Sequence, residues 1–223
     1  MKSIFKFSTL LFITLLVFAC KPAGEKAETS EAGEVAAKVG TTYAVNTANS
    51  KIMWVGTKVG GQHNGDMQLK SGELAMQDGK ITGGNFVIDM NSINVLDLEG
   101  GKKAGLEGHL KGIGDEAKTD HFFNVGMYPE AKFEITKATQ LLNDENANYI
   151  ISGNLTLRDK TKEVKFKAKI ENAETAITVT TPSFTINRTE WGVNYGSASL
   201  TDGLKDKAIN DNIGLEIMLV ASK

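Results

Sequence analysis

The stretch Glu163-Val164-Lys165-Phe166-Lys167-Ala168-Lys169-Ile170 alternates between charged and apolar residues at every step. Successive side chains of a β-strand point to opposite faces, so this period places the four apolar residues on a buried face and the lysines in water. The stretch therefore predicts a half-buried strand, and the same alternation recurs along much of the chain.

Turn signals connect these strands into hairpins. Asp78-Gly79, the strongest two-residue hairpin signal, lies between a strand through Leu74 and a strand through Phe86. A strand over 151–157 precedes the opening stretch, and residues 158–162 form the connection between the two. Further strands are expected over 42–45, 51–59, 131–138, 176–180, 183–187 and 213–220.

A sheet of about eight or nine hairpin-linked strands must hide its edges, and closing into a barrel achieves this. The predicted fold class is therefore all-β: an antiparallel β-barrel of eight strands or slightly more. Residues 97–128 break the alternation, and Leu106 and Leu110 lie one helical turn apart. A short helix is expected there, within a long inter-strand loop of the kind that often acts as a lid or binding loop.

The N-terminus has the pattern of a secretory signal. Two lysines precede the apolar run from Leu10 to Phe18, which is too short to span a bilayer. Val17-Phe18-Ala19-Cys20 resembles the bacterial lipobox, in which a diacylglycerol is joined to the cysteine before cleavage. Cys20 is the only cysteine of the chain, so residues 1–19 are predicted to be a signal peptide and Cys20 the site of lipidation. The alternative is an ordinary signal peptide with an incidental cysteine.

The residues after Cys20 contain almost nothing to bury. Such a composition does not offset the entropy of ordering, so residues 20–41 are predicted to be a flexible tether and 42–223 a single domain. We therefore expect a membrane-anchored lipoprotein of the periplasm or cell envelope. Loss of residues 1–19 leaves 23 basic and 27 acidic residues, a net charge of −4, without the basic footprint of a nucleic-acid-binding protein.

Catalytic motifs are sparse. His63, His109 and His121 supply three imidazoles, which could together hold zinc, but their spacing matches no helical metal motif. They could equally be loop residues near the barrel mouth. No Gly-x-Ser-x-Gly sequence is present, so no catalytic residue is assigned and an enzyme is not expected.

Aromatic residues occur on almost every predicted strand. They could fill the interior of a small barrel, or they could line a slot for an elongated apolar ligand. The residues are Trp54, Phe86, Phe122, Phe123, Phe133, Phe166, Phe184 and Trp191.

An ordered set of motifs resembles the YceI-like family from about Tyr43 to the C-terminus. The motifs are Ser50-x-Ile52-x-Trp54-x-Gly56-x-Lys58, His63-x-Gly65, Gly72-x-Leu74, Gly83-Gly84-x-Phe86-x-Ile88-Asp89-Met90, His109-Leu110-Lys111, Phe122-Phe123-Asn124-Val125, Tyr128-Pro129-x-Ala131-x-Phe133, Gly153-Asn154-Leu155-Thr156-Leu157 and Arg188-x-x-Trp191-Gly192. The sequence departs from the common pattern between Lys111 and Phe122, where residues 112–121 are inserted.

The resemblance implies a lipocalin-like barrel whose channel binds an amphiphilic polyisoprenoid, such as an isoprenoid quinone or a prenyl chain. The tail would lie along the axis, and the polar head would sit at the rim against His63, His109 or Arg188. The expected tail contacts are Trp54, Leu74, Phe86, Ile88, Phe133, Leu155, Phe166 and Phe184, with Phe122, Phe123 and Trp191 as further ligand-binding candidates.

Three functions stay open at this point. The first is a non-enzymatic, membrane-anchored lipid carrier or storage protein with no metal or cofactor. The second is a metal-dependent periplasmic enzyme that uses His63, His109 and His121. The third is a structural or stress-related envelope protein with a filled barrel. The sequence leaves homodimerisation open.

Overall fold

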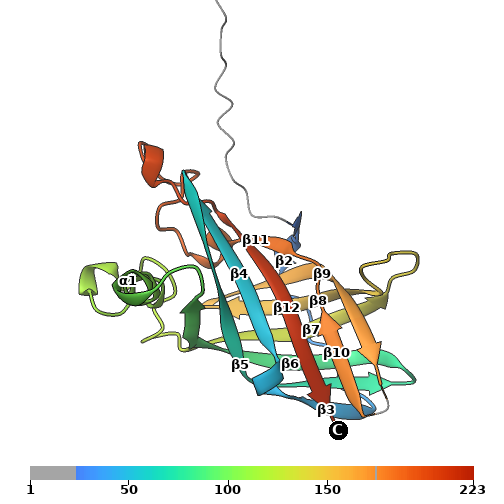
Figure 1. Ribbon diagram of the computed structural model, residues 1–223. Coiled ribbons are helices and arrows are strands. Elements are labelled where there is room, and N and C mark those ends of the chain that lie inside the picture. Colours follow the sequence, from blue (N-terminus) through green and yellow to red (C-terminus); the bar gives the residue numbers. More distant parts are fainter. Residues whose placement is uncertain (1–23, 174) are drawn as a thin grey trace, which may run out of the picture.

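The computed structural model, drawn in Figure 1, describes residues 24–173 and 175–223. Within these residues, eight antiparallel strands close into a ring. Each strand pairs with the next, and the last returns to the first through the β12–β4 ladder. The predicted all-β barrel is therefore confirmed. The ring strands are β4 (Lys51–Lys58), β5 (Gly61–Gln77), β6 (Lys80–Val95), β7 (Glu130–Gln140), β8 (Tyr149–Leu157), β9 (Lys160–Asn172), β10 (Ala176–Thr180) and β12 (Asn212–Ser222).

Four shorter strands extend this ring. β3 (Thr41–Val45) pairs with one end of β5 and with the last residues of β12. β11 (Phe184–Asn187) continues along β12 beyond the end of β10. β1 (Glu25–Lys26) and β2 (Glu28–Glu31) are not members of the ring; β1 pairs with β11 and β2 with β9. Short 3₁₀ helices are η1 (Thr47–Asn49), η2 (Glu116–Lys118), η3 (Arg188–Trp191) and η4 (Lys205–Lys207).

Local backbone chemistry sets the hairpins. Asp78 and Gly79 both have positive φ, 51° and 73°, as the favoured two-residue hairpin turn requires. The β8–β9 turn is tighter than the predicted connection, because Arg158, at φ 57°, and Asp159 reverse the chain alone. Both expected hairpins are therefore present.

Strand β5 is much longer than the sequence indicates. Its first half, from Gly61 to about Gln68, is polar and glycine-rich and lacks a clear alternation. Gly65 pairs with Trp54 across the β4–β5 ladder, and a Cβ atom at Gly65 would lie 2.4 Å from the Trp54 ring. Register shifts near Asp66 and Leu69 bend the strand around the barrel. Glycine here lets the indole lie against the wall.

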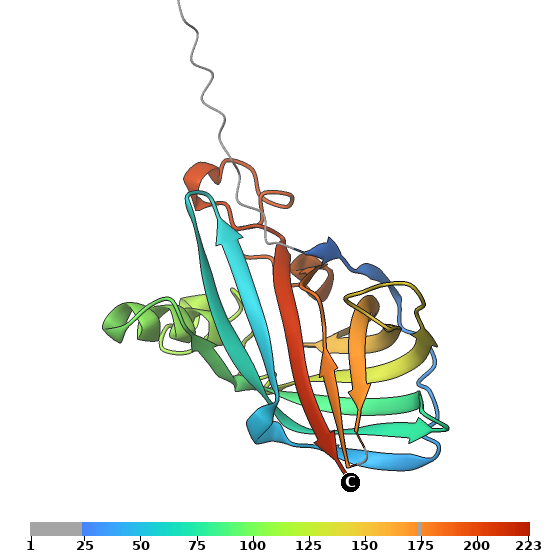
Figure 2. The ribbon, with the colours of Figure 1, turned by 45° about the vertical axis from the view of Figure 1, so that its right-hand side comes forward.

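The N-terminal strap, defined as residues 24–39, differs from the predicted flexible tether. β2 pairs antiparallel with Lys162–Lys165 of β9, and Figure 2 shows the segment continuing down the outside of the barrel towards β3. Glu28 and Glu31 bond to Lys165 and Lys162 at 2.9 and 2.5 Å. Lys165, which was predicted to face water, thus pairs with a glutamate from a distant segment, as does Lys162. Cys20 and the predicted signal peptide lie outside the described residues.

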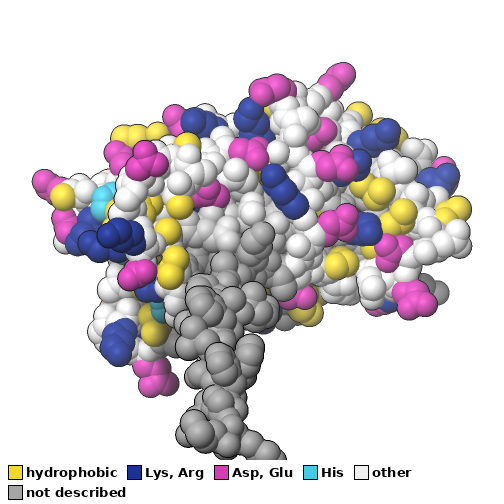
Figure 3. Space-filling model, turned by 90° about the horizontal axis from the view of Figure 1, so that it is seen from above, with side chains coloured by type: hydrophobic (Ala, Val, Ile, Leu, Met, Phe, Trp, Pro, Cys, Tyr) yellow, Lys and Arg dark blue, Asp and Glu magenta, His cyan; other side chains and the backbone are white. Residues whose placement is uncertain are grey.

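The outer surface carries both signs of charge. Figure 3 shows acidic and basic side chains interspersed over the face seen from above. No helix among the described residues is long and apolar enough to cross a membrane.

Two clusters of buried side chains occupy the barrel. The α1-side cluster includes Trp54, Met90 and Phe122 and lies near helix α1 (Gly100–Lys111), which is the short helix predicted from the sequence. The β3-side cluster includes Tyr43 and Leu74 at the opposite end. Partly buried Ile52, Phe166 and Ile217 pack against both clusters, so the interior is continuous along the axis.

Candidate functional site: an apolar cavity inside the barrel

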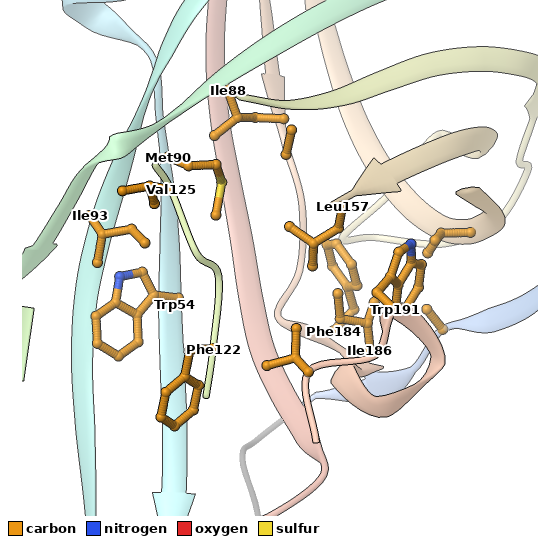
Figure 4. Close-up of a cluster of buried hydrophobic side chains, with 14 of the residues drawn as sticks. Trp54, Ile88, Met90, Ile93, Phe122, Val125, Leu157, Phe184, Ile186 and Trp191 are labelled. Carbon is orange, nitrogen blue, oxygen red and sulfur yellow. The ribbon is translucent and has the colours of Figure 1, made fainter. Parts of the chain in front are cut away.

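A cavity of about 300 Å³ lies within the α1-side cluster. Figure 4 shows Trp54, Met90 and Phe122 on one side of this space and Leu157 and Ile186 on the other. Its wall comes from β4 to β8, β11 and β12, and from Leu106 and Leu110 of α1. Nearly all of this lining is apolar, whereas the polar side chains gather around Lys58, His63, His109 and Asn210.

A second cavity of about 80 Å³ lies in the β3-side cluster. Its lining is wholly apolar and includes Leu69, Leu74 and Phe133. Ile52 and Ile88 line both cavities, so they form a waist between a larger and a smaller compartment. The filled-barrel alternative requires an interior volume near zero, which these cavities do not match.

The structure brings most of the sequence-predicted ligand residues to these two spaces. The larger cavity is lined by Trp54, His63, Ile88, His109, Phe122, Phe123, Leu155 and Arg188, and the smaller by Leu74, Phe86, Ile88, Phe133 and Phe166. Phe184 and Trp191 line neither cavity. Both are buried in the α1-side cluster, where they act as packing residues.

Several lining residues were missed by the sequence analysis. Ile52 stands two positions before Trp54, and Ile213 and Leu215 alternate along β12, so period-two alternation could have found all three. Met67 lies in the polar half of β5 and carries no such signal. Further apolar residues that line the larger cavity are Met90, Ile93, Leu106, Leu110, Ala131, Leu157, Ile186 and Ile209.

Arg188 lines the cavity, but its donors are engaged by the backbone. The guanidinium donates to the carbonyl oxygens of Val193, Ile209 and Asn210 at 2.6, 3.3 and 3.1 Å. Asp211 lies 3.6 Å away, and burial lowers the pKa of Arg188 while this carboxylate raises it. Arg188 therefore fastens the segment between β11 and β12 over the barrel and offers few free donors to a ligand head.

His63 sits at the polar end of the cavity beside Asp97. The Nδ1 atom of His63 lies 2.8 Å from Oδ2 of Asp97, and the Asn64 backbone N–H donates to the other carboxylate oxygen at 3.1 Å. Partial burial alone would raise the pKa of Asp97, but these hydrogen bonds outweigh it and lower the pKa below 3.8. The ionised carboxylate orients the imidazole, leaving the Nε2 edge of His63 as the one available to a ligand.

His109 and His121 contact each other at the C-terminal end of α1. The Nε2 atom of His109 lies 2.8 Å from Nδ1 of His121, so one ring donates and the other accepts. Tyr195 stacks on His121 with ring centroids 3.9 Å apart, and Phe122 approaches His109 edge-on. Burial, with the nearby charges of His121 and Lys118, lowers the pKa of His109. The pair joins the helix to the loop that follows it.

The three histidines do not form a metal-binding set. His109 and His121 contact each other, whereas His63 pairs with Asp97. Among the described residues, no three or more His, Cys, Asp or Glu side chains gather in an arrangement that could hold a metal ion. Nothing in this geometry favours the metal-dependent enzyme.

Comparison with solved structures places the fold. BcnA of Burkholderia cenocepacia superposes with a TM-score of 0.61 at 19% identity, covering 80% of this chain and 99% of the BcnA chain. A polyisoprenoid binding domain from Saccharophagus degradans, implicated in plant cell wall breakdown, superposes with a TM-score of 0.59 at 16% identity, covering 81% and 97% of the two chains. At these identities the likeness shows a shared fold.

Comparison of the sequence with protein families identifies a family, whereas the superpositions show only the fold. No curated protein matches the chain. The YceI-like domain, in contrast, matches residues 43–221, which is most of the sequence and includes all of the ring strands except the last residue of β12. The order of motifs from Ser50 to Trp191 and the closed barrel agree with this match. The chain therefore belongs to the YceI-like family.

Proposed function

We propose that this protein binds the tail of an amphiphilic polyisoprenoid, such as a prenyl quinone, inside the barrel. The observation that carries the proposal is the larger cavity, which is apolar over nearly all of its wall and polar at one end. The family match and the solved polyisoprenoid binding domain with the same fold support this ligand class.

The hydrophobic effect would supply most of the affinity. Removing a few hundred Å² of hydrocarbon from water contributes several kcal/mol, at roughly 25 cal/mol per Å², before the costs of immobilising the ligand. The larger cavity, at about 300 Å³, lies at the lower end of the range for small-molecule sites. A long tail would therefore pass the waist at Ile52 and Ile88 into the smaller cavity.

The head of the lipid would lie at the polar end of the cavity. His63 and His109 line this end, and each keeps part of its surface open. Imidazole N–H groups would donate to carbonyl or hydroxyl oxygens of the head, while Lys58 would favour an anionic one. Arg188 is assigned a structural role instead, because its donors already serve the backbone.

The protein would act as a binding protein at the cell envelope, held to a membrane through a lipid on Cys20. The short apolar run before Cys20 and the lipobox-like sequence support this placement. In this role it would carry or store its lipid without changing it chemically.

Titration with a prenyl quinone in detergent tests the proposal, with quenching of the fluorescence of Trp54 as the signal. We expect saturable quenching, and a stoichiometric prenyl compound in organic extracts of protein from the native host. An empty extract together with no saturable quenching would refute the proposal.

A matched pair of variants locates the site. Ala131→Leu fills part of the larger cavity and should weaken binding by about tenfold or more with little loss of stability. Ala168 is equally buried but lines neither cavity, so Ala168→Leu should overpack the β3-side cluster and lower stability by about 1–3 kcal/mol. Equal affinity in Ala131→Leu and the unaltered chain would place the ligand elsewhere.

A further inference from the structure

The barrel wall has an interruption next to β9. β10 pairs with β9 only over Lys169–Asn172, and the chain then leaves the ladder before β11 begins at Phe184. β11 pairs with β12 on one side, and its other side does not meet β9. A slot therefore separates Lys162–Lys165 of β9 from the start of β11.

The N-terminal strap fills this slot. β1 pairs in parallel with Phe184 and Thr185 of β11, and the Ala27 N–H donates to the Thr185 carbonyl oxygen at 2.8 Å. β2 then pairs antiparallel with β9. Residues 25–31 are thus one inserted strand, hydrogen-bonded first to one side of the slot and then to the other, and Figure 1 shows this strand beside β9 and β11.

The ligand cavities lie directly behind the strap. Ala27 is buried in the α1-side cluster together with Phe184. Phe184 stacks on Phe166 across the slot, with ring centroids 4.7 Å apart and ring planes 5° from parallel. Phe166 lines the smaller cavity, and Ile186 of β11 lines the larger one. The stacked side chains of Phe166 and Phe184, together with the inserted strand, therefore separate the solvent from the cavities.

The inserted strand is weakly held compared with the ring. Within residues 24–40, Ala27 is the only buried residue, so little apolar surface opposes release. The three glutamates that bond to β9 lysines are 74–89% exposed, and such surface ion pairs contribute about 0–1 kcal/mol each. Segments with few buried contacts open locally while the rest of the fold stays intact.

The chain is fixed to the barrel directly after the inserted strand, so this point could serve as the hinge for its release. The side chain of Asn154, which is 5% exposed, accepts from the Gly33 N–H at 2.9 Å and donates to the Gly33 carbonyl oxygen at 2.8 Å. Ala36 then donates to the Ile135 carbonyl oxygen, which a register shift in the β7–β8 ladder leaves available. The strap is thus fixed at Gly33 and beyond, whereas residues 25–31 have no comparable clamp from a buried side chain.

We infer that residues 25–31 form a removable strand that gates a lateral entrance for the lipid tail between β9 and β11. The inference rests on the proposed function for its cargo. The strap lies outside the family match, which begins at residue 43, so the family resemblance does not extend to this strand. Glu25 is five positions after Cys20, a reach of at most about 18 Å, so a lipid on Cys20 would hold the entrance close to the bilayer.

A reversible cross-link tests the gate. With Cys20→Ser in all proteins, Glu28→Cys and Lys165→Cys place two thiols at register partners whose native side chains are 2.9 Å apart. We expect the oxidised protein to take up a prenyl quinone from phosphatidylcholine vesicles about tenfold more slowly than the reduced one, by Trp fluorescence quenching. Thr156→Cys with Thr161→Cys, which joins β8 to β9, is the control and should show one rate in both states.

Hydrogen exchange supplies a readout that needs no ligand. The amides of residues 27–31 should exchange about 100-fold faster than those of the β8–β9 ladder in the unaltered protein. Equal uptake rates for oxidised and reduced Glu28→Cys/Lys165→Cys, or exchange of 27–31 as slow as that of the ladder, would overturn the gate. Absence of quenching in every protein, together with an empty extract, would instead refute the proposed cargo, and the exchange rates would then decide whether the strand opens.

Discussion

The indole N–H of Trp191 donates to the Leu155 carbonyl oxygen at 2.9 Å, whereas that of Trp54 is buried with no hydrogen-bond partner among the described residues. Trp191 is fully buried in close packing, and Trp54 borders the larger cavity. Two residues of one type therefore serve different purposes, one as a fixed part of the wall and the other as a lining of free space.

Replacing each tryptophan with phenylalanine should separate these purposes. Trp191→Phe loses a hydrogen bond and leaves a void, so we expect it to lower the free energy of unfolding by about 2–4 kcal/mol. Trp54→Phe removes a donor that has no partner, so its cost should be smaller by about 1 kcal/mol or more. Urea unfolding measures both, since each variant keeps one tryptophan as a probe. Equal losses would contradict the assignment.

Residue patterns reveal which side chains point inward but not which of them leave space. Alternation predicts Trp54, Leu155 and Phe166 as inward-facing, and all three line cavities. Phe184 and Arg188 were also ligand-binding candidates from the sequence. However, Phe184 stacks on another ring, and Arg188 donates to backbone carbonyl oxygens. Free volume depends on how all the walls pack together, and no local pattern encodes it.

At the scale of elements, α1 and the loop after it cover the polar end of the cavity. Leu106 and Leu110 pack towards the interior, and the His109–His121 contact fixes the loop to the helix. Only one proton fits between the two facing nitrogen atoms, so charging both rings would push the elements apart. The neighbouring charges are Lys118 and Asp115, which act on His109 with opposite signs.

The pH dependence of stability should reflect this contact. The pKa of His109 is lowered in the fold from 6.5, so the unfolded chain binds more protons just below that value. Stability is thus fully present above about pH 6.5 and should fall as the pH drops towards the lowered pKa. Urea unfolding between about pH 7 and pH 5 should show this slope, and His109→Gln should flatten it.

Asp97→Asn is the control for this measurement. The pKa of Asp97 is lowered below 3.8, so its contribution is lost only in more acidic solution. This variant should retain the slope of the unaltered protein between about pH 7 and pH 5. A His109→Gln variant with an undiminished slope would show that other groups cause it.

Element prediction succeeded where signals are local. The Asp78-Gly79 turn, the short helix around Leu106 and the alternating strand β9 all follow from neighbouring residues. β1 and β2 were missed because their sequence is polar and has no apolar alternation. They are ordered by backbone pairing with β11 and β9, and their glutamates meet β9 lysines more than 130 residues away in the chain.

At the scale of the whole molecule, the predicted lipid on Cys20 would hold the barrel at a membrane. Cys20→Ser should move the protein from the membrane fraction to the soluble fraction, because the acyl chains supply the anchoring energy. Immunoblots of fractionated native-host cells measure this, with prenyl quinone binding by the purified variant as the check on folding. Unchanged membrane association in the variant would argue against lipidation.

The waist formed by Ile52 and Ile88 divides the interior into two cavities that are otherwise lined by different residues. In the proposed binding mode, the head group would contact only the larger cavity next to α1, and the far end of the hydrocarbon would reach only the smaller cavity next to β3. The number of isoprene units and the identity of the ring that carries them would thus be selected by separate sets of residues. Relatives with the same barrel could change one preference by substitution without disturbing the other.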